Sequence, residues 1–187
     1  RLGPSTIPDN AALDVRIVNG GTSGSIDLAS TATEIATLKM DASDGPATVA
    51  MAGSVLNIGG DAGSGIIQSA TSGALTVGEV ANQGTLTTGG TPNAVATALG
   101  LANDSVTQDL TIQSVIADNG SDVVSLSKSG AGRVVLNGTN TLTGSVAVGA
   151  GTLHIGSVAG ASVTGALGAN TSISNAGTVV FRRTDTA

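Results

Sequence analysis

Between Val124 and Gly156, short segments of alternating apolar and polar residues follow one another with almost no residues to spare. The apolar positions of these segments are Val124 and Leu126, Val134 and Leu136, Val146 and Val148, and finally Leu153 and Ile155. Glycine or asparagine bounds each segment, and alternation over four to six residues with such boundaries is typical of short, half-buried strands. The stretch therefore predicts an all-β fold built from closely spaced strands.

Few aromatic side chains are available to fill a core. The 187 residues include 28 glycines and one phenylalanine, and neither tryptophan nor tyrosine. Valine, isoleucine, leucine and alanine must therefore form the core, and such small, similar side chains suit a stack of coils about 4.8 Å apart. Because crossovers between parallel strands are right-handed, we predict a single-stranded, right-handed parallel β-helix, also called a β-solenoid.

The pattern divides the chain into three parts. Residues 1–12 contain two prolines and several turn residues, which predicts an extended N-terminal arm without strand pairing. Residues 13–113 and 114–187 are both expected to form solenoid coils. Within the first set, Ile35 and Leu38 have a helical spacing, but the neighbouring threonines and the loop that follows favour a strand.

Residues 91–103 interrupt this pattern. Alanine and leucine are frequent from 94 to 101 and a glycine lies near the end, so a short helix or a protruding loop is expected. An interruption of a repeat is often where function is inserted.

Residues 114–187 also carry a set of motifs in a fixed order. The motifs are KSGAG at 128–132, NGTN at 137–140, TG at 143–144 and GAGTLHIG at 149–156. In this order they resemble the autotransporter-associated β-strand repeat, also called the passenger-associated transport repeat. That family usually has a tyrosine before the TG step, where this chain has Leu142. Residues 114–120 are similar to the family's lead-in, and residues 176–186 resemble the opening of a next copy, with Arg182 at a position where asparagine is frequent.

The resemblance implies an exported protein of the autotransporter kind, located outside the cell or on a bacterial cell surface. In that family the repeats are thought to assist folding and secretion of the passenger. The expected function is a structural stalk or passenger segment, with neighbouring repeats of the parent chain, or other copies placed end to end, as partners. The absence of cysteine agrees with export. No signal peptide is recognised, as expected for a mature product or a segment.

The charge distribution argues against two other classes of protein. The net charge is −6 and, apart from Arg182 and Arg183, the cations are spread singly, whereas nucleic-acid binding requires clustered cations. No apolar run approaches the length of about 18 residues that a membrane-spanning helix needs. We therefore expect no nucleic-acid partner and no membrane span in this chain.

Paired carboxylates are the remaining route to an enzyme. Asp41 with Asp44, and Asp118 with Asp122, are each close enough in sequence to share a loop, and glycosidases use two carboxylates. Both pairs, however, lie in loops rich in glycine and serine, where aspartate is favoured because its side chain caps turns. We expect no enzymatic activity, no catalytic residues and no cofactor.

The sequence gives little indication of a metal site or of a functional histidine. The run GGDAG at 59–63 is similar to a calcium-binding glycine–aspartate repeat. Each site of that repeat needs consecutive copies of the motif, and this chain contains the run only once. Residues 118–122 offer oxygen ligands without a bidentate glutamate. A turn is the favoured interpretation of both, and no metal site is expected. His154, the single histidine, lies between Leu153 and Ile155, so alternation predicts that it faces solvent.

Two alternative functions stay open. A subunit of a self-assembling extracellular filament or sheath is one, because an exposed terminal coil presents a strand edge that another copy can pair with. A surface adhesin or carbohydrate-active β-helix is the other, and it would hold its ligand in a groove or at residues 91–103. The aromatic faces and arginine clusters typical of carbohydrate sites are missing from the sequence.

Overall fold

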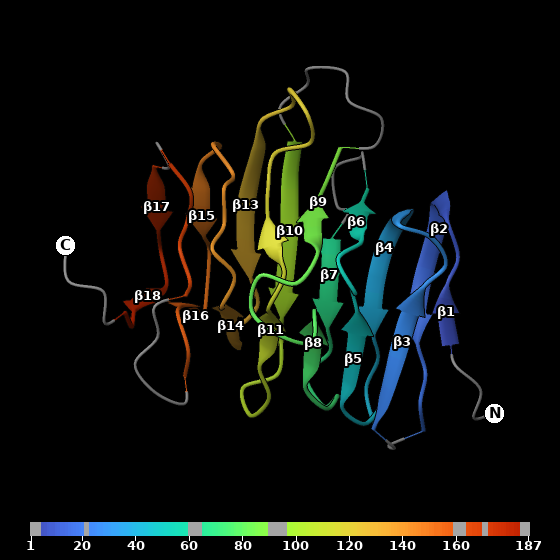
Figure 1. The fold of residues 1–187 in the computed structure, drawn as a ribbon. Helices are drawn as coiled ribbons and strands as arrows, with labels where there is room; N and C mark the ends of the chain where they lie inside the picture. The colour runs from blue at the N-terminus through green and yellow to red at the C-terminus, as the bar shows by residue number, and fades with distance from the viewer. Residues whose placement is uncertain are drawn as a thin grey trace.

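The computed structural model describes residues 5–20, 23–59, 65–89, 97–158, 164–169 and 172–183. Within these ranges every regular element is a β-strand, and the strands lie side by side along one axis from the N-terminal to the C-terminal end (Figure 1). In the part of the chain so described, no helix is long and apolar enough to cross a membrane.

Among the described residues, the first sheet has eight parallel strands that follow one another in chain order. Its strands are β1 (Ser5–Ile7), β3 (Gly24–Leu28), β5 (Ala47–Ala50), β8 (Leu75–Val77), β11 (Leu110–Ile112), β14 (Arg133–Leu136), β16 (Thr152–Ile155) and β18 (Thr178–Phe181). Since each strand pairs with the one before and the one after it in this series, the chain returns to the same side once per coil.

The second sheet has ten strands in the part of the chain that the structure describes, and its pairs are also parallel. They are β2 (Asn10–Ile17), β4 (Ala32–Met40), β6 (Val55–Ile58), β7 (Gly65–Gln68), β9 (Thr85–Thr87), β10 (Thr97–Asn103), β12 (Val115–Ile116), β13 (Val124–Ser129), β15 (Val146–Val148) and β17 (Ile173–Asn175). The sheet branches at β4, whose first half pairs with β6 and whose second half pairs with β7.

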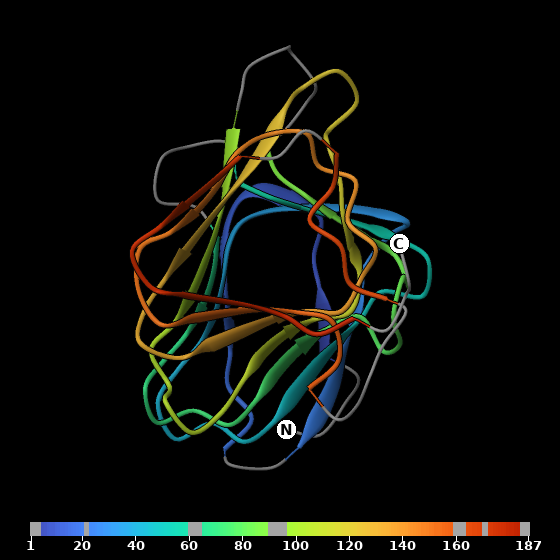
Figure 2. The ribbon, with the colours of Figure 1, turned by 90° about the vertical axis from the view of Figure 1, so that its left-hand side faces the viewer.

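The branch gives each coil three sides. β4 runs unbroken across two of them, whereas the following coils cover the same two sides with separate strands, β6 and β7, β9 and β10, and β12 and β13. Viewed along the axis, the coils surround one common interior (Figure 2). Side chains fill that interior, and one continuous hydrophobic cluster extends from Ile7 to Leu167.

The core consists of rows in which apolar residues of successive coils lie in register. One row of the first sheet contains Val49, Val77, Ile112, Leu136 and Ile155, all fully buried. A second row contains Leu75, Leu110, Val134 and Leu153, also fully buried. Burying one such side chain contributes about 1.5–3 kcal/mol, so every coil is stabilised by both of its neighbours.

The predicted all-β solenoid is confirmed, including the strand rather than helix at Ala32–Met40. The right-handed sense of the coils stays a prediction. Leu142, at the position where the family usually has tyrosine, is fully buried in the core.

The expectation that residues 1–12 lack strand pairing is wrong. β1 pairs with β3, with Ile7 opposite Leu28, and Asn10 at the start of β2 is opposite Ile35. Ile7 is 1% exposed. Prolines at 4 and 8 flank β1 instead of interrupting it, which leaves the backbone N–H groups of this three-residue strand free for pairing.

The helix considered for residues 91–103 is also wrong where the chain is described, because Thr97–Asn103 forms β10. β10 pairs with β7 on one side and β13 on the other, and its Leu99 and Leu101 point into the core. Packing on two neighbouring strands thus overrides the helical propensity of its alanines and leucines. Residues 91–96 lie outside the described part.

Candidate functional site

The motifs at 128–132 and 149–151 form turns of successive coils at the same corner, between the second sheet and the first. Gly130 has a φ of +76°, and a Cβ atom on it would lie 2.2 Å from the carbonyl oxygen of Asn103 in the preceding coil. Gly151, with a φ of +65°, is equally close to its predecessor, because a Cβ atom there would lie 2.5 Å from the carbonyl oxygen of Gly130. Only glycine lets these turns stack in direct contact.

Lys128 is buried inside this corner. In the register of the second sheet it lies between Leu101 and Val148, both buried core residues, and its own exposure is 1%. Its Nζ donates hydrogen bonds to the backbone carbonyls of Ser129 at 2.6 Å, Gly130 at 2.7 Å and Ala150 at 3.0 Å. An ammonium group has three donors, so these bonds use all of them.

The third acceptor connects two coils, because Ala150 belongs to the turn of the following one. Burial lowers the pKa of Lys128 below the ordinary value of a lysine, and the negative charge of Asp104 in the preceding coil opposes that shift. The burial of Lys128 is not among the predictions made from the sequence. Its position in strict alternation with Val124 and Leu126 is the signal that indicates an inward orientation.

Two buried asparagines also join successive coils. The Nδ2 atom of Asn103 donates to the carbonyl of Gln108 at 2.9 Å and to the carbonyl of Arg133, one coil further on, at 2.8 Å. The Oδ1 atom of Asn103 accepts from the backbone N–H of Ser105 at 2.8 Å. Asn103 is fully buried, so these bonds satisfy backbone groups that water cannot reach.

Asn140 has the corresponding role at another corner. Its Oδ1 accepts from the backbone N–H of Ile116 in the preceding coil at 2.8 Å, and its Nδ2 donates to the carbonyl of Ala166 in the following coil at 2.6 Å. It is 3% exposed. One side chain thereby connects three successive passes of the chain. In the sequence, this asparagine is recognisable only as a turn residue.

The candidate carboxylate pair Asp118 and Asp122 stabilises turns. Asp118 accepts hydrogen bonds from the backbone N–H of Val124 at 2.9 Å and from the N–H and hydroxyl of Thr143, at 3.1 and 2.7 Å. Burial opposes its ionisation, but these bonds outweigh that effect and lower the pKa of the carboxyl. Asp122 is buried, and its backbone pairs with Asn119 to close a small hairpin.

The second predicted pair is likewise engaged by neighbouring residues. Asp41 forms ion pairs with Arg16 and with Lys39, the latter with an Nζ–Oδ1 distance of 3.1 Å. Asp44 accepts hydrogen bonds from the backbone N–H of Asn19 at 3.1 Å and of Gly20 at 3.3 Å. The contacts of Asp44 match the turn-capping interpretation, whereas Asp41 is held in ion pairs.

Of the two regions considered for calcium, only residues 118–122 lie wholly within the described part of the chain. Residues 60–63 of the GGDAG run lie outside the described part of the chain. Among the residues that the structure does describe, no group of three or more histidine, cysteine, aspartate or glutamate side chains is placed to hold a metal ion.

The prediction that His154 faces solvent is wrong. The alternation does place it on the outer face of the first sheet, between Val135 and Val180 of the adjacent strands, but it is only 6% exposed. Burial lowers the pKa of its imidazole, and a hydrogen bond with the backbone of Ser157 opposes the shift. His154 is therefore covered on the outer face, where it contacts the backbone of Ser157, and strand alternation alone cannot reveal this.

The motifs that carry the family resemblance therefore coincide with the corners and strands described above. Residues 126–155 match the family model of the passenger-associated-transport-repeat. No curated protein and no solved structure is significantly similar to the chain. The matched segment includes Lys128, Asn140 and the stacked glycines, and it begins and ends within core strands. Residues 126–155 of this β-solenoid thus match the passenger-associated-transport-repeat.

Proposed function

We propose that this chain is a structural segment of an exported, autotransporter-like surface protein, where it serves as a rigid stalk or passenger segment and assists folding during secretion. The passenger-associated-transport-repeat at 126–155 is the observation that carries this proposal. No enzymatic role is included, since the carboxylates considered for catalysis are engaged as turn acceptors and in ion pairs.

The proposed assistance to folding has a physical basis in the register of the coils. Each coil presents a row of unpaired backbone groups and an apolar face to the next, so a formed coil is a template on which the next can pair. Asn140, which bonds to both the preceding and the following pass of the chain, adds specific polar contacts to that template. Folding that propagates in this way would draw a chain through an export channel and prevent its return.

The experiment that tests this function is display on a bacterial surface. The chain would be fused to the translocation barrel of an autotransporter, and a Gly130→Val variant, which disrupts the stacked turns, would be compared with Gly149→Ala, which leaves ordinary contact distances. We expect the Gly130→Val fusion to lose surface display and protease resistance, while Gly149→Ala retains both. Equal display of the two fusions would refute the proposed role in secretion.

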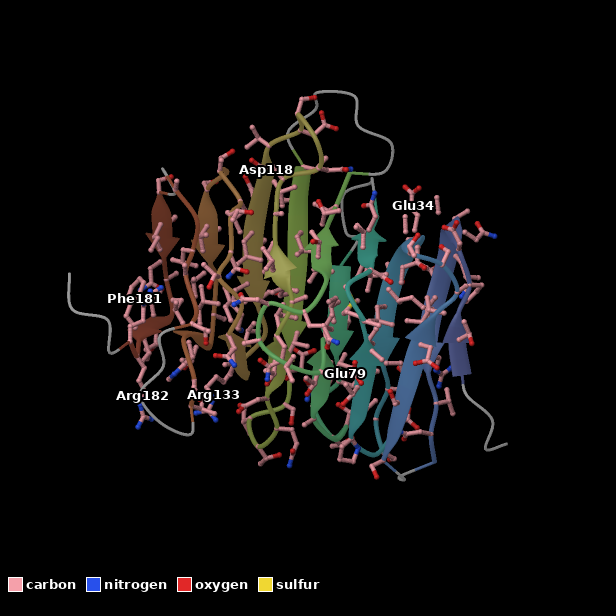
Figure 3. All side chains as sticks on the ribbon, in the orientation of Figure 1. Glu34, Glu79, Asp118, Arg133, Phe181 and Arg182 are labelled. Atoms are coloured by element: carbon pink, nitrogen blue, oxygen red, sulfur yellow. The ribbon has the colours of Figure 1, made fainter. Side chains whose placement is uncertain are left out.

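A filament subunit is the second candidate, and the distribution of charge favours it. Residues 1–125 contain three Lys/Arg and twelve Asp/Glu, whereas residues 126–187 contain four and one. Glu34 lies toward the N-terminal end of the stack and Arg133 and Arg182 toward the C-terminal end (Figure 3). Opposite ends of two copies would therefore attract each other.

Sedimentation at several protein and salt concentrations separates the two candidates. A filament subunit should form larger species as the concentration rises, and salt should dissociate them because it screens the attraction between the oppositely charged ends. A stalk segment should stay at the mass of one chain throughout.

A further inference from the structure

In a stack of similar coils, neighbouring strands can align in more than one register. Parallel strands can slide past one another by two residues without turning any side chain to the other face. On β15, Val146 and Val148 are both buried core residues of the same size. Apolar packing alone therefore distinguishes poorly between β13 aligned as observed and β13 shifted by two residues.

Lys128 distinguishes the two alignments. In the observed register it is opposite Val148, and its ammonium reaches the carbonyl of Ala150 in the next turn. Its other two acceptors, Ser129 and Gly130, are local and would follow it in any alignment. A shift that placed Lys128 opposite Val146 would move the ammonium away from Ala150 and leave a buried charge with an unused donor, which is costly.

The preceding coil also favours the observed register of β13. Leu101, opposite Lys128 on that side, offers no hydrogen-bond acceptor in its side chain, but Asp104 at the following turn favours a positive charge at this corner. The environment of the ammonium is thus completed by one coil on each side, and it exists only where the turns at 103–104, 129–132 and 149–151 lie over one another.

We propose that Lys128 is a register-determining residue, which fixes how β13 aligns with β15 and does so at little net gain in stability. A buried polar group that selects one alignment among several apolar ones is best known from coiled coils. The cost of burying the ammonium offsets most of what its three hydrogen bonds contribute. This role is separate from export, and it goes beyond the proposed structural function.

Engineered cysteine pairs can report the register directly, because the chain contains no cysteine. Ser127 is opposite Ala147, and both are exposed on the outer face, so a Ser127→Cys/Ala147→Cys pair crosslinks in the observed register. A Ser127→Cys/Ser145→Cys pair reports a shift by two residues, since Ser145 is also exposed and lies two positions earlier. Disulfide yield after oxidation is measured by mass spectrometry.

Each pair would be placed in three backgrounds: the unchanged chain, Lys128→Met, and the control Lys39→Met, which removes a lysine whose side chain is 47% exposed. The unchanged chain and the control should crosslink almost entirely through the Ala147 pair. In Lys128→Met the Ser145 pair should gain about fivefold or more relative to the Ala147 pair, while the β-sheet circular dichroism and the melting temperature stay close to those of the unchanged chain.

Three results would overturn the proposal. The first is a Lys128→Met protein that folds and crosslinks in the same ratio as the unchanged chain. The second is a wild-type chain that already crosslinks through both pairs. The third is failure of both Lys128→Met and Lys128→Leu to fold, because the lysine would then be required for stability itself. The Leu variant copies Leu101 of the preceding coil, so folding of either variant allows the register to be measured.

Discussion

Arg133 and Asp109 form a bidentate ion pair across adjacent coils. Arg133 Nε donates to Asp109 Oδ1 at 2.8 Å, and Arg133 Nη2 donates to Asp109 Oδ2 at 2.6 Å. The hydrogen bonds that Arg133 donates to Asp109 raise the pKa of its guanidinium above the ordinary value. Figure 3 shows Arg133 at the lower surface of the stack. The pair joins β14 to the segment just before β11 on the outer face, where both side chains are partly exposed to water.

We predict that this ion pair contributes little to stability despite its geometry. Replacing Arg133 with Ala, Asp109 with Ala, and both together should give a coupling free energy of about 0.5–1 kcal/mol, because partly exposed pairs are weakened by solvent. Urea unfolding of the four proteins measures the coupling, and 1 M NaCl should reduce it. A coupling well above this range would show that the outer face is less hydrated than its exposure suggests.

Gly130 should tolerate no side chain. A Gly130→Ala substitution places a Cβ atom 2.2 Å from the carbonyl oxygen of Asn103 in a backbone conformation that disfavours L residues. We expect a loss of about 3 kcal/mol or more in the free energy of unfolding. Gly149→Ala is the matched control, since its Cβ would lie 3.6 Å from the nearest atom, and it should change the stability by less than about 1 kcal/mol.

Asn140 should be far more important than its exposed neighbour Thr141. An Asn140→Ala substitution leaves the N–H of Ile116 and the carbonyl of Ala166 without their partner. Each buried group left unsatisfied costs about 1–3 kcal/mol, so a loss of about 2–5 kcal/mol is expected in chemical denaturation. Thr141→Ala should be nearly neutral. Similar losses for both would mean that the turn conformation matters and not the two inter-coil bonds.

The buried histidine predicts a loss of stability in mild acid. The folded chain binds a proton at His154 less readily than the unfolded chain, whose histidine has a pKa near 6.5. As the pH falls below about 6.5, the unfolded state gains a proton that the folded state lacks, so the free energy of unfolding should decrease until the lower folded pKa is reached. Above that range His154 is neutral in both states and has no effect.

Because the chain contains a single histidine, one substitution is enough to assign the loss of stability in mild acid to it. Unfolding measured from pH 7.5 to 5.5 should show the decrease in the unchanged chain and a flatter profile in His154→Val, which matches the valines on either side of it. The slope per pH unit cannot exceed about 1.4 kcal/mol for one proton. An equal decrease in both proteins would assign the acid sensitivity to the carboxylates instead.

Alternation and composition were sufficient to predict the fold class and most of the core. Val134, Leu136, Leu153 and Ile155 all point inward as the period of two requires. The strand at 97–103 was missed because alanine and leucine favour a helix, and only the strands on both sides of β10 decide against it. Which strands pair is a property of the whole stack, so a local pattern cannot provide it.

The polar contacts between coils were harder to predict from the sequence than the core. Asn103 and Asn140 look like ordinary turn residues in the sequence, and their inward orientation depends on how the backbone bends at each corner. The burial of His154 on the outer face, where it contacts the backbone of Ser157, does not follow from the strand pattern. Alternation tells which face a side chain is on, but it does not tell whether that face is covered.

β4 runs unbroken across two sides of its coil, whereas three later coils cover these sides with two strands each, and this difference has a consequence for how such a chain can diversify. A connection joins β6 to β7, β9 to β10 and β12 to β13, and because the strands on either side are stacked, these junctions follow one edge of the stack. Lengthening a connection of this kind costs little free energy and leaves both pairing partners of each strand in place. New binding loops can therefore be grafted along this edge in parallel, several per molecule and a fixed strand spacing apart, while the rest of the coil keeps its sequence.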